Sequence, residues 1–85
     1  MQKAYKNRGV VKYKLGNYKD AIADFQKQME LDPNDASAYK NRGVTKGKLG
    51  DYEGAVEDLK KSIELDPSTK YELQDLIDLA QAKIK

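Results

Sequence analysis

The chain has no cysteine, histidine or tryptophan, and only two prolines and one phenylalanine among its 85 residues. Without cysteine and histidine, disulfides, thiol nucleophiles and imidazole bases are excluded, and a zinc site loses its usual ligands. No apolar run approaches the roughly 18 residues that a membrane-spanning helix requires, and the N-terminal stretch lacks the hydrophobic segment of a signal peptide. These absences favour a small, helical, cytoplasmic protein without a metal or other cofactor.

Charged residues make up 35% of the chain and hydrophobic residues 39%, and 16 basic against 14 acidic side chains leave a net charge of +2. A charge so close to balance does not drive disorder by self-repulsion. A chain of this length buries only about 60–65% of the surface that its unfolded form exposes. We therefore expect one domain with a thin core and modest stability.

A repeat of 34 residues organises the sequence. Placing residues 4–33 over residues 38–67 matches 19 of 30 positions. The heptapeptide AYKNRGV occurs in both copies, KLGNY returns as KLGDY, and MELDP returns as IELDP. A fixed period of this length is typical of stacked helical hairpins. The sequence therefore predicts a single domain made of repeat one (2–35), repeat two (36–69) and a C-terminal capping helix (69–85).

Each unit has the pattern of two helices joined by a turn. Apolar residues recur at helical spacing, Gly16 supplies a left-handed stop, and Pro33 and Pro67 end the second helices. Asn17 and Asp51 precede those helices and are residue types that cap a first turn. The pattern predicts no strand and five helices, at residues 3–15, 18–31, 37–49, 52–65 and 69–84. The expected buried residues are Tyr5, Gly9, Ala21, Ile22, Phe25, Leu31, Tyr39, Gly43, Ala55, Val56, Leu59, Leu65, Leu73, Leu76 and Ile77.

A helical hairpin of 34 residues that closes on Asp-Pro resembles the tetratricopeptide repeat. The resemblance covers residues 2–69, and the tail is similar to the family's solvating C-terminal helix. It implies an all-α fold, an α-α superhelix of two helix-turn-helix repeats and a capping helix, with five antiparallel helices. The signature positions that both units share are the aromatics Tyr5 and Tyr39, the glycines Gly9 and Gly43, the aromatics Tyr18 and Tyr52, the small residues Ala21 and Ala55, and the prolines Pro33 and Pro67.

Three departures from the family pattern introduce polar groups. Arg8 and Arg42 stand where the family usually has leucine, and Asp24 and Asp58 lie beside the core stripe of the second helices. We interpret these acids as partners of basic residues on the adjacent first helix, in a partly buried ion pair. A solvent-exposed pair of little energetic value is the alternative. Gln28 replaces an alanine at a close helix contact, and we expect its side chain to extend to the edge of that contact.

Positive charge gathers in the first helix of each unit. Residues 2–14 carry +5 and residues 36–48 carry +4, while the second helices and loops hold nearly all the acids. In tetratricopeptide arrays the first helices line a concave groove that receives an extended peptide. The resemblance therefore implies a protein-interaction scaffold with a basic groove, which favours an acidic peptide or a C-terminal carboxylate. The expected groove residues are Lys6, Asn7, Val10, Tyr13, Lys14, Lys40, Asn41, Val44 and Lys48.

One subclass of the family binds the acidic C-terminal tails of cytosolic chaperones through a two-carboxylate clamp. Lys6 and Asn41 match residues of that clamp, but Val10 replaces its first asparagine. The tail offers Gln74 and Asp78 where the clamp needs bases. A complete clamp is therefore not expected.

Other functions fit the sequence less well than peptide binding. The chain has no histidine or cysteine for catalysis, and an open two-repeat solenoid does not enclose carboxylates or lysines. We therefore expect no enzyme. The basic helices, and tyrosines that could stack on bases, are features of nucleic-acid binding. Tyr5 and Tyr39, however, are positions of the repeat core. A designed or excised minimal repeat protein with no partner of its own is the remaining alternative. We expect a monomer, because the cationic first helices repel their copies, with a dimer that pairs or swaps ends as the alternative.

Overall fold

The computed structural model describes residues 2–84, and of Gln2 only the backbone. These residues form five α-helices and no strand, and a 3-10 helix precedes the last α-helix. The α-helices begin and end within one or two residues of the predicted ends, which confirms the helical reading of the sequence. The elements are α1 (Gln2–Lys14), α2 (Tyr18–Leu31), α3 (Ala36–Lys48), α4 (Tyr52–Leu65), η1 (Pro67–Thr69) and α5 (Lys70–Lys83).

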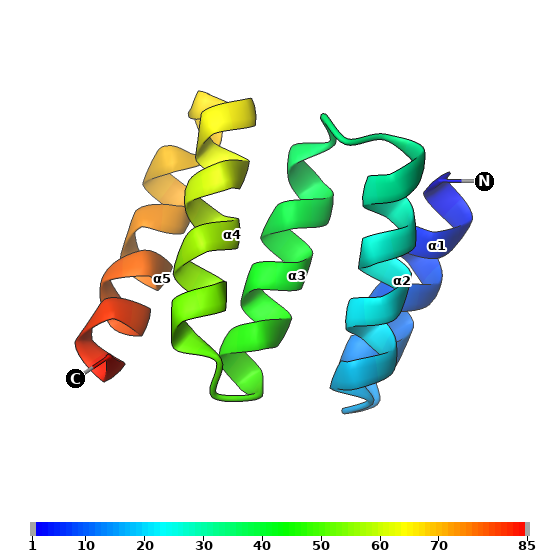
Figure 1. The fold of residues 1–85 in the computed structure, drawn as a ribbon, viewed down its shortest axis with the longest axis horizontal. Helices are drawn as coiled ribbons and strands as arrows, with labels where there is room; N and C mark the ends of the chain where they lie inside the picture. The colour runs from blue at the N-terminus through cyan, green and yellow to red at the C-terminus, as the bar shows by residue number, and fades with distance from the viewer. Residues whose placement is uncertain (1, 85) are drawn as a thin grey trace.

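The helices stack side by side in chain order, each antiparallel to the one before it (Figure 1). The main contacts join α1 to α2, α2 to α3, α3 to α4 and α4 to α5. The result is a slab of 36 × 27 × 17 Å with the two ends of the chain at its opposite edges (Figure 1). Because α1, α3 and α5 run in the same direction, their last turns lie at the same end of the molecule.

Glycine ends the first helix of each unit in a left-handed conformation. Gly16 and Gly50 have φ of 83° and 86°, the region that residues with a Cβ rarely adopt. The expected caps differ between the units. The Asp51 side chain accepts a hydrogen bond from the Gly54 amide at 2.9 Å, whereas Asn17 makes no side-chain cap bond with the described residues of α2. The prediction of a cap is therefore confirmed for Asp51 and wrong for Asn17.

The core is a row of apolar side chains at the helix contacts. Of the expected buried set, the residues that are buried are Gly9, Ala21, Phe25, Gly43, Ala55, Val56, Leu59, Leu73 and Ile77, and those that are half-buried are Tyr5, Ile22, Tyr39 and Leu65. Two expectations are wrong. Leu31 ends α2 and is 52% exposed, whereas Leu65 at the same repeat position lies in α4, against which η1 packs. Leu76 is 39% exposed because it belongs to a pocket described below.

The expectation that Gln28 extends to the edge is also wrong. Its exposed fraction is 0%, and its Nε2 donates to Asp35 Oδ2 at 2.8 Å and to Ser37 Oγ at 3.3 Å. Its Oε1 is buried and finds no hydrogen-bond partner among the described residues. The amide therefore ties α2 to the start of α3 rather than meeting solvent. Ser62, at the same position of repeat two, bonds the Ala36 carbonyl at 2.8 Å.

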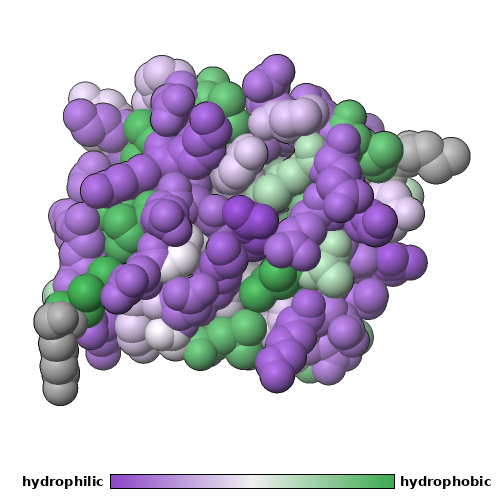
Figure 2. All heavy atoms as spheres, in the orientation of Figure 1, coloured by the Kyte–Doolittle hydropathy of each residue, from purple (hydrophilic) through white to green (hydrophobic). Residues whose placement is uncertain are grey.

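The surface is mostly hydrophilic. In Figure 2, polar and charged residues cover most of the face shown, and hydrophobic residues appear between them as separate small patches. None of the helices among residues 2–84 is long and apolar enough to cross a membrane.

Candidate functional site

Two equivalent ion clusters join the helices of each unit. Arg42 donates from Nε and Nη2 to the two oxygens of Asp58 at 2.7 and 2.8 Å, and Lys46 lies 3.3 Å from Asp58 Oδ2. In repeat one Arg8 binds Asp24 in the same two-pronged manner at 2.9 and 2.7 Å. The predicted pairing between first and second helices is thus confirmed in both units, and these residues hold the hairpins together.

The clusters differ in how far they are removed from water. Both carboxylates are buried, but the Arg8 side chain is 58% exposed and that of Arg42 only 20%. Arg42 belongs to α3, which has α2 on one side and α4 on the other, whereas α1 packs mainly on α2. A two-pronged pair gains more from its charges where less water screens it. We therefore expect the removal of one partner to cost more in repeat two than in repeat one.

The Asp24 cluster makes stability depend on pH. Hydrogen bonding from Arg8 holds the pKa of Asp24 below its ordinary value, against the opposing effect of burial. A lowered pKa in the folded state stabilises the fold above the unfolded pKa of about 3.9, and this contribution disappears as pH falls through the folded value. In urea titrations between pH 7 and pH 2, the stability difference between the wild type and Asp24→Asn should narrow below about pH 4. A difference that stays constant with pH would contradict this assignment.

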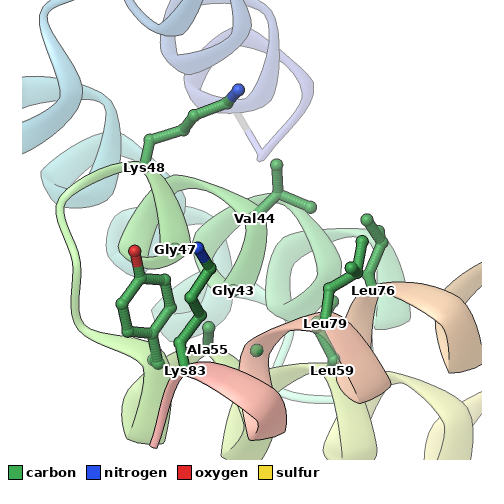
Figure 3. A pocket seen from close by; sticks show the side chains of 11 residues that line it. Gly43, Val44, Gly47, Lys48, Ala55, Leu59, Leu76, Leu79 and Lys83 are labelled. Atoms are coloured by element: carbon green, nitrogen blue, oxygen red, sulfur yellow. The ribbon is translucent and has the colours of Figure 1, made fainter.

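A pocket of about 210 Å³ opens between α3 and α5 and is also lined by residues of α4. Its apolar wall contains Val44 of α3 and the two α5 residues Leu76 and Leu79. Lys48 and Lys83, in the last turns of α3 and α5, complete its rim. Figure 3 shows the Lys83 side chain extending toward Gly47, while Lys48 points away from Lys83. The pocket thus combines an apolar wall with two lysines whose ammonium groups do not converge.

Two of the pocket residues in repeat two differ from their counterparts in repeat one: Gly47 stands in place of Tyr13, and Leu59 in place of Phe25. In repeat one the rings of Tyr13 and Tyr18 pack together with their centroids 5.5 Å apart. The corresponding residues of repeat two are Gly47 and Tyr52, and both line the pocket. With no side chain on Gly47, the space that the first ring occupies in repeat one is empty in repeat two. A Cβ placed on Gly47 would meet only Ala55 Cβ, at 3.8 Å.

Lysines recur at the end of the molecule where the pocket lies. Lys14 and Lys48 occupy the same position in the two repeats, in the last turns of α1 and α3. Lys83 is the basic residue in the last turn of α5. The three helices run in the same direction (Figure 1), so Lys14, Lys48 and Lys83 all lie at this end, where Lys12 and Lys46 are paired with Asp24 and Asp58. An anionic ligand across these turns is favoured by Coulomb attraction.

The structure distributes the expected groove residues unevenly. Val44 and Lys48 line the pocket. Lys6 lines a second cavity of about 250 Å³ together with Lys3, Gln28 and Asp35. Lys40 lies 3.5 Å from Glu72 of α5. The remaining expected residues line neither of these cavities: Asn7 and Lys14 are exposed, and Val10, Tyr13 and Asn41 are half-buried.

Sequence reasoning missed the contribution of α5. It placed Gln74 and Asp78 at the groove, but these two bond each other at 3.0 Å. The α5 residues that line the pocket are Leu76, Leu79, Ala80 and Lys83. Two of the three buried residues of α3 have buried counterparts in α5 at a spacing of 35 rather than 34 residues, while Gly43 keeps the spacing of 34 to Ile77. Ala38 and Thr45 of α3 thus correspond to the buried Leu73 and Ala80 of α5. Applied to the expected groove residues Asn41, Val44 and Lys48, this offset gives Leu76, Leu79 and Lys83, three of the four α5 residues that line the pocket.

A metal site has no basis in the described residues. Residues 2–84 contain no group of three or more histidine, cysteine, aspartate or glutamate side chains able to hold an ion. The chemistry that the pocket offers is apolar contact and ammonium groups, which serve binding.

Two consecutive matches to a family model, spaced at the repeat period, identify the family. The model of the tetratricopeptide repeat matches residues 3–35 and again residues 36–69. The chain belongs to the tetratricopeptide repeat family. Members of this family are protein-interaction scaffolds, and the all-helical architecture predicted from the resemblance is confirmed. No curated protein sequence matches the chain.

Solved tetratricopeptide repeat structures share this fold. The crystal structure of MamA superposes with a TM-score of 0.77 at 24% identity, covering 98% of this chain and 54% of MamA. The first tetratricopeptide repeat domain of Spaghetti (RPAP3), bound to the HSP90 peptide SRMEEVD, superposes with a TM-score of 0.76 at 23% identity. That match covers 96% of this chain and 74% of the other. The chain thus spans about half the length of MamA, and at these identities the likeness concerns the fold.

Proposed function

We propose that this tetratricopeptide repeat protein binds an extended acidic peptide across α1, α3 and α5. The observation that carries the proposal is the set of lysines in the last turns of these helices, Lys14, Lys48 and Lys83, beside an apolar pocket. Ammonium groups on neighbouring helices fit a series of carboxylates along a strand-like peptide. The tetratricopeptide repeat domain of RPAP3, which is bound to the HSP90 peptide SRMEEVD with its three acidic residues, supports this choice of ligand.

The proposal extends to the kind of protein this is. We infer a cytoplasmic scaffold without catalytic activity, because the pocket presents apolar side chains and lysines rather than a paired acid and base. Basic residues at both ends of the helices lie near acids, because Lys83 also lines a cavity with Asp51 and Glu53. Lys40 already lies beside Glu72, and Lys6 lines its cavity together with Asp35.

Charge reversal of the lysines in the last turns of α1 and α3 tests the proposal. Lys14→Glu/Lys48→Glu should weaken binding of a fluorescein-labelled hexaglutamate peptide at least about tenfold in anisotropy titrations, and salt should weaken the wild-type complex. The matched control is Lys19→Glu/Lys60→Glu, which changes net charge equally at exposed positions of α2 and α4. Equal losses in both double variants would refute a localised site. Tighter binding of an oligothymidylate than of the peptide would favour nucleic acid as the partner instead.

A further inference from the structure

The outer side of α1 is exposed, although the equivalent side of α3 is covered. In repeat two Ala38 and Thr45 have exposed fractions of 0%, and α3 packs against both α2 and α4. Their counterparts in repeat one are Ala4, which is exposed, and Val11, which is 55% exposed, because α1 packs mainly on α2. One turn further along α1, Leu15 is 71% exposed. These residues form an apolar stripe at helical spacing.

Positive charge borders this stripe. Arg8 lies on it between Ala4 and Val11, and its side chain is 58% exposed although it binds Asp24. Residues 2–14 contain five basic residues and no acidic one. The stripe and its arginine, defined here as the α1 face (Ala4, Arg8, Val11 and Leu15), thus combine apolar contact with positive charge.

The outer side of α5 combines apolar contact with the opposite charge. Tyr71 is 93% exposed and Leu79 is 64% exposed, whereas Leu73 and Ile77 on the other side of the helix are buried. At helical spacing, the side turned away from α4 carries five exposed residues, defined here as the α5 face: Tyr71, Asp75, Asp78, Leu79 and Ala82. All of these except Tyr71 line an open hollow of about 420 Å³, and none of the described residues that line it is basic.

Each of the two faces attracts the other and repels a copy of itself. A two-fold contact between two α1 faces brings positive charges together, and one between two α5 faces brings aspartates together. Charge therefore favours contact between unlike faces. The helices α1 and α5 lie at opposite edges of the slab (Figure 1), so a molecule that binds through one face still presents the other.

We propose that the partner of the α1 face is a second copy of this chain, which contributes its α5 face. Val11 and Leu15 of one molecule pack in the α5 hollow of the next, where Asp75 and Asp78 meet the basic border of α1. Such a head-to-tail contact repeats and builds an open row of molecules rather than a closed dimer. One helix of 13 or 14 residues from each copy makes a small interface, so the association is weak. At low micromolar concentration the chain stays monomeric, as the sequence leads us to expect.

Sedimentation equilibrium of the wild type tests the association. At about 20 mM salt, the weight-average mass should rise continuously from that of a monomer at about 10 μM to beyond that of a dimer at about 1 mM. Salt at about 500 mM should lower the association constant at least about threefold, because the charges are exposed. A mass that stays monomeric up to about 1 mM, that levels off at the dimer, or that does not respond to salt would overturn the proposal.

Two variants that each block one face distinguish head-to-tail contact from two-fold pairing. Val11→Glu places an acid on the α1 face, and Asp75→Lys/Asp78→Lys reverses the charge of the α5 face. Each variant should be monomeric on its own, whereas their mixture should associate, because the first keeps the α5 face and the second keeps the α1 face. Two-fold pairing through either face predicts that one of the variants still dimerises alone, and that result would overturn the proposal.

A charge-matched control shows whether position or net charge decides. Glu53→Lys/Glu57→Lys changes the net charge by the same amount as the α5 variant, at exposed positions of α4. It should associate as the wild type does, and equal loss of association in this control would refute a role of the α5 face. All the substituted residues are exposed, and circular dichroism spectra that match the wild type establish that the variants are folded.

Discussion

Replacing Asp58 by leucine should lower the free energy of unfolding by about 3 kcal/mol, the lower end of the range for breaking a buried ion pair. The carboxylate is 6% exposed and receives two hydrogen bonds from Arg42 and one close contact from Lys46. Its removal leaves two cations against an apolar interface without their counter-charge. The Arg42 side chain retains 20% of its exposure, and this contact with water reduces the loss. The melting temperature should fall by about 12–24 °C for a domain of this size.

A double-mutant cycle separates the pair from its neighbours. Arg42→Leu restores the leucine that the family usually has at this position, and with Asp58→Leu it replaces two charges by apolar groups. The double variant should regain most of the stability lost in Asp58→Leu, because well-packed apolar residues often replace a buried pair at no cost. Urea unfolding of all four proteins gives the coupling energy. Strictly additive losses would show that Arg42 and Asp58 act independently.

Repetition explains why the fold and the ion clusters were predictable. Arg8 recurs as Arg42 and Asp24 recurs as Asp58, so each polar substitution occurs twice on both members of a helix pair. A paired substitution that occurs twice within one chain indicates that the two residues are in contact, and no alignment of related sequences is needed to see it. The helix ends were equally readable, because glycine supplies the positive φ after each first helix, as Gly16 shows.

The remaining features depend on positions that do not repeat. Gln28 has serine as its counterpart, and whether a long amide turns outward or inward depends on acceptors such as Asp35 and Ser37, which become neighbours only when α2 and α3 pack. The pocket likewise depends on Gly47. In the sequence a glycine at this position indicates only a low helix propensity, and it does not reveal a pocket. The rotation of α5 that brings Lys83 to the pocket follows from an offset of one residue in a tail outside the repeat.

Alanine at Gly43 and at Gly47 should change stability in opposite directions, although both glycines lie in α3. A Cβ on Gly43 would lie 3.0 Å from Asp58 Cβ and 3.2 Å from the Ala55 carbonyl oxygen. Those atoms belong to the backbone of α4 and to a side chain held by Arg42, so they cannot move aside without separating the helices. Overpacking of this kind costs about 1–3 kcal/mol. Gly43→Ala should therefore unfold at lower urea concentration than the wild type.

Gly47→Ala is the internal control for the intrinsic helix preference. Its nearest contact would be an ordinary 3.8 Å from Ala55 Cβ, so the substitution should stabilise α3 by about 1 kcal/mol, the difference between glycine and alanine in a helix. The two variants carry the same chemical change one helical turn apart, and their unfolding midpoints should lie on opposite sides of that of the wild type. If both substitutions stabilised the protein, the close approach of α3 and α4 at Gly43 would be refuted, because helix preference alone would then account for both.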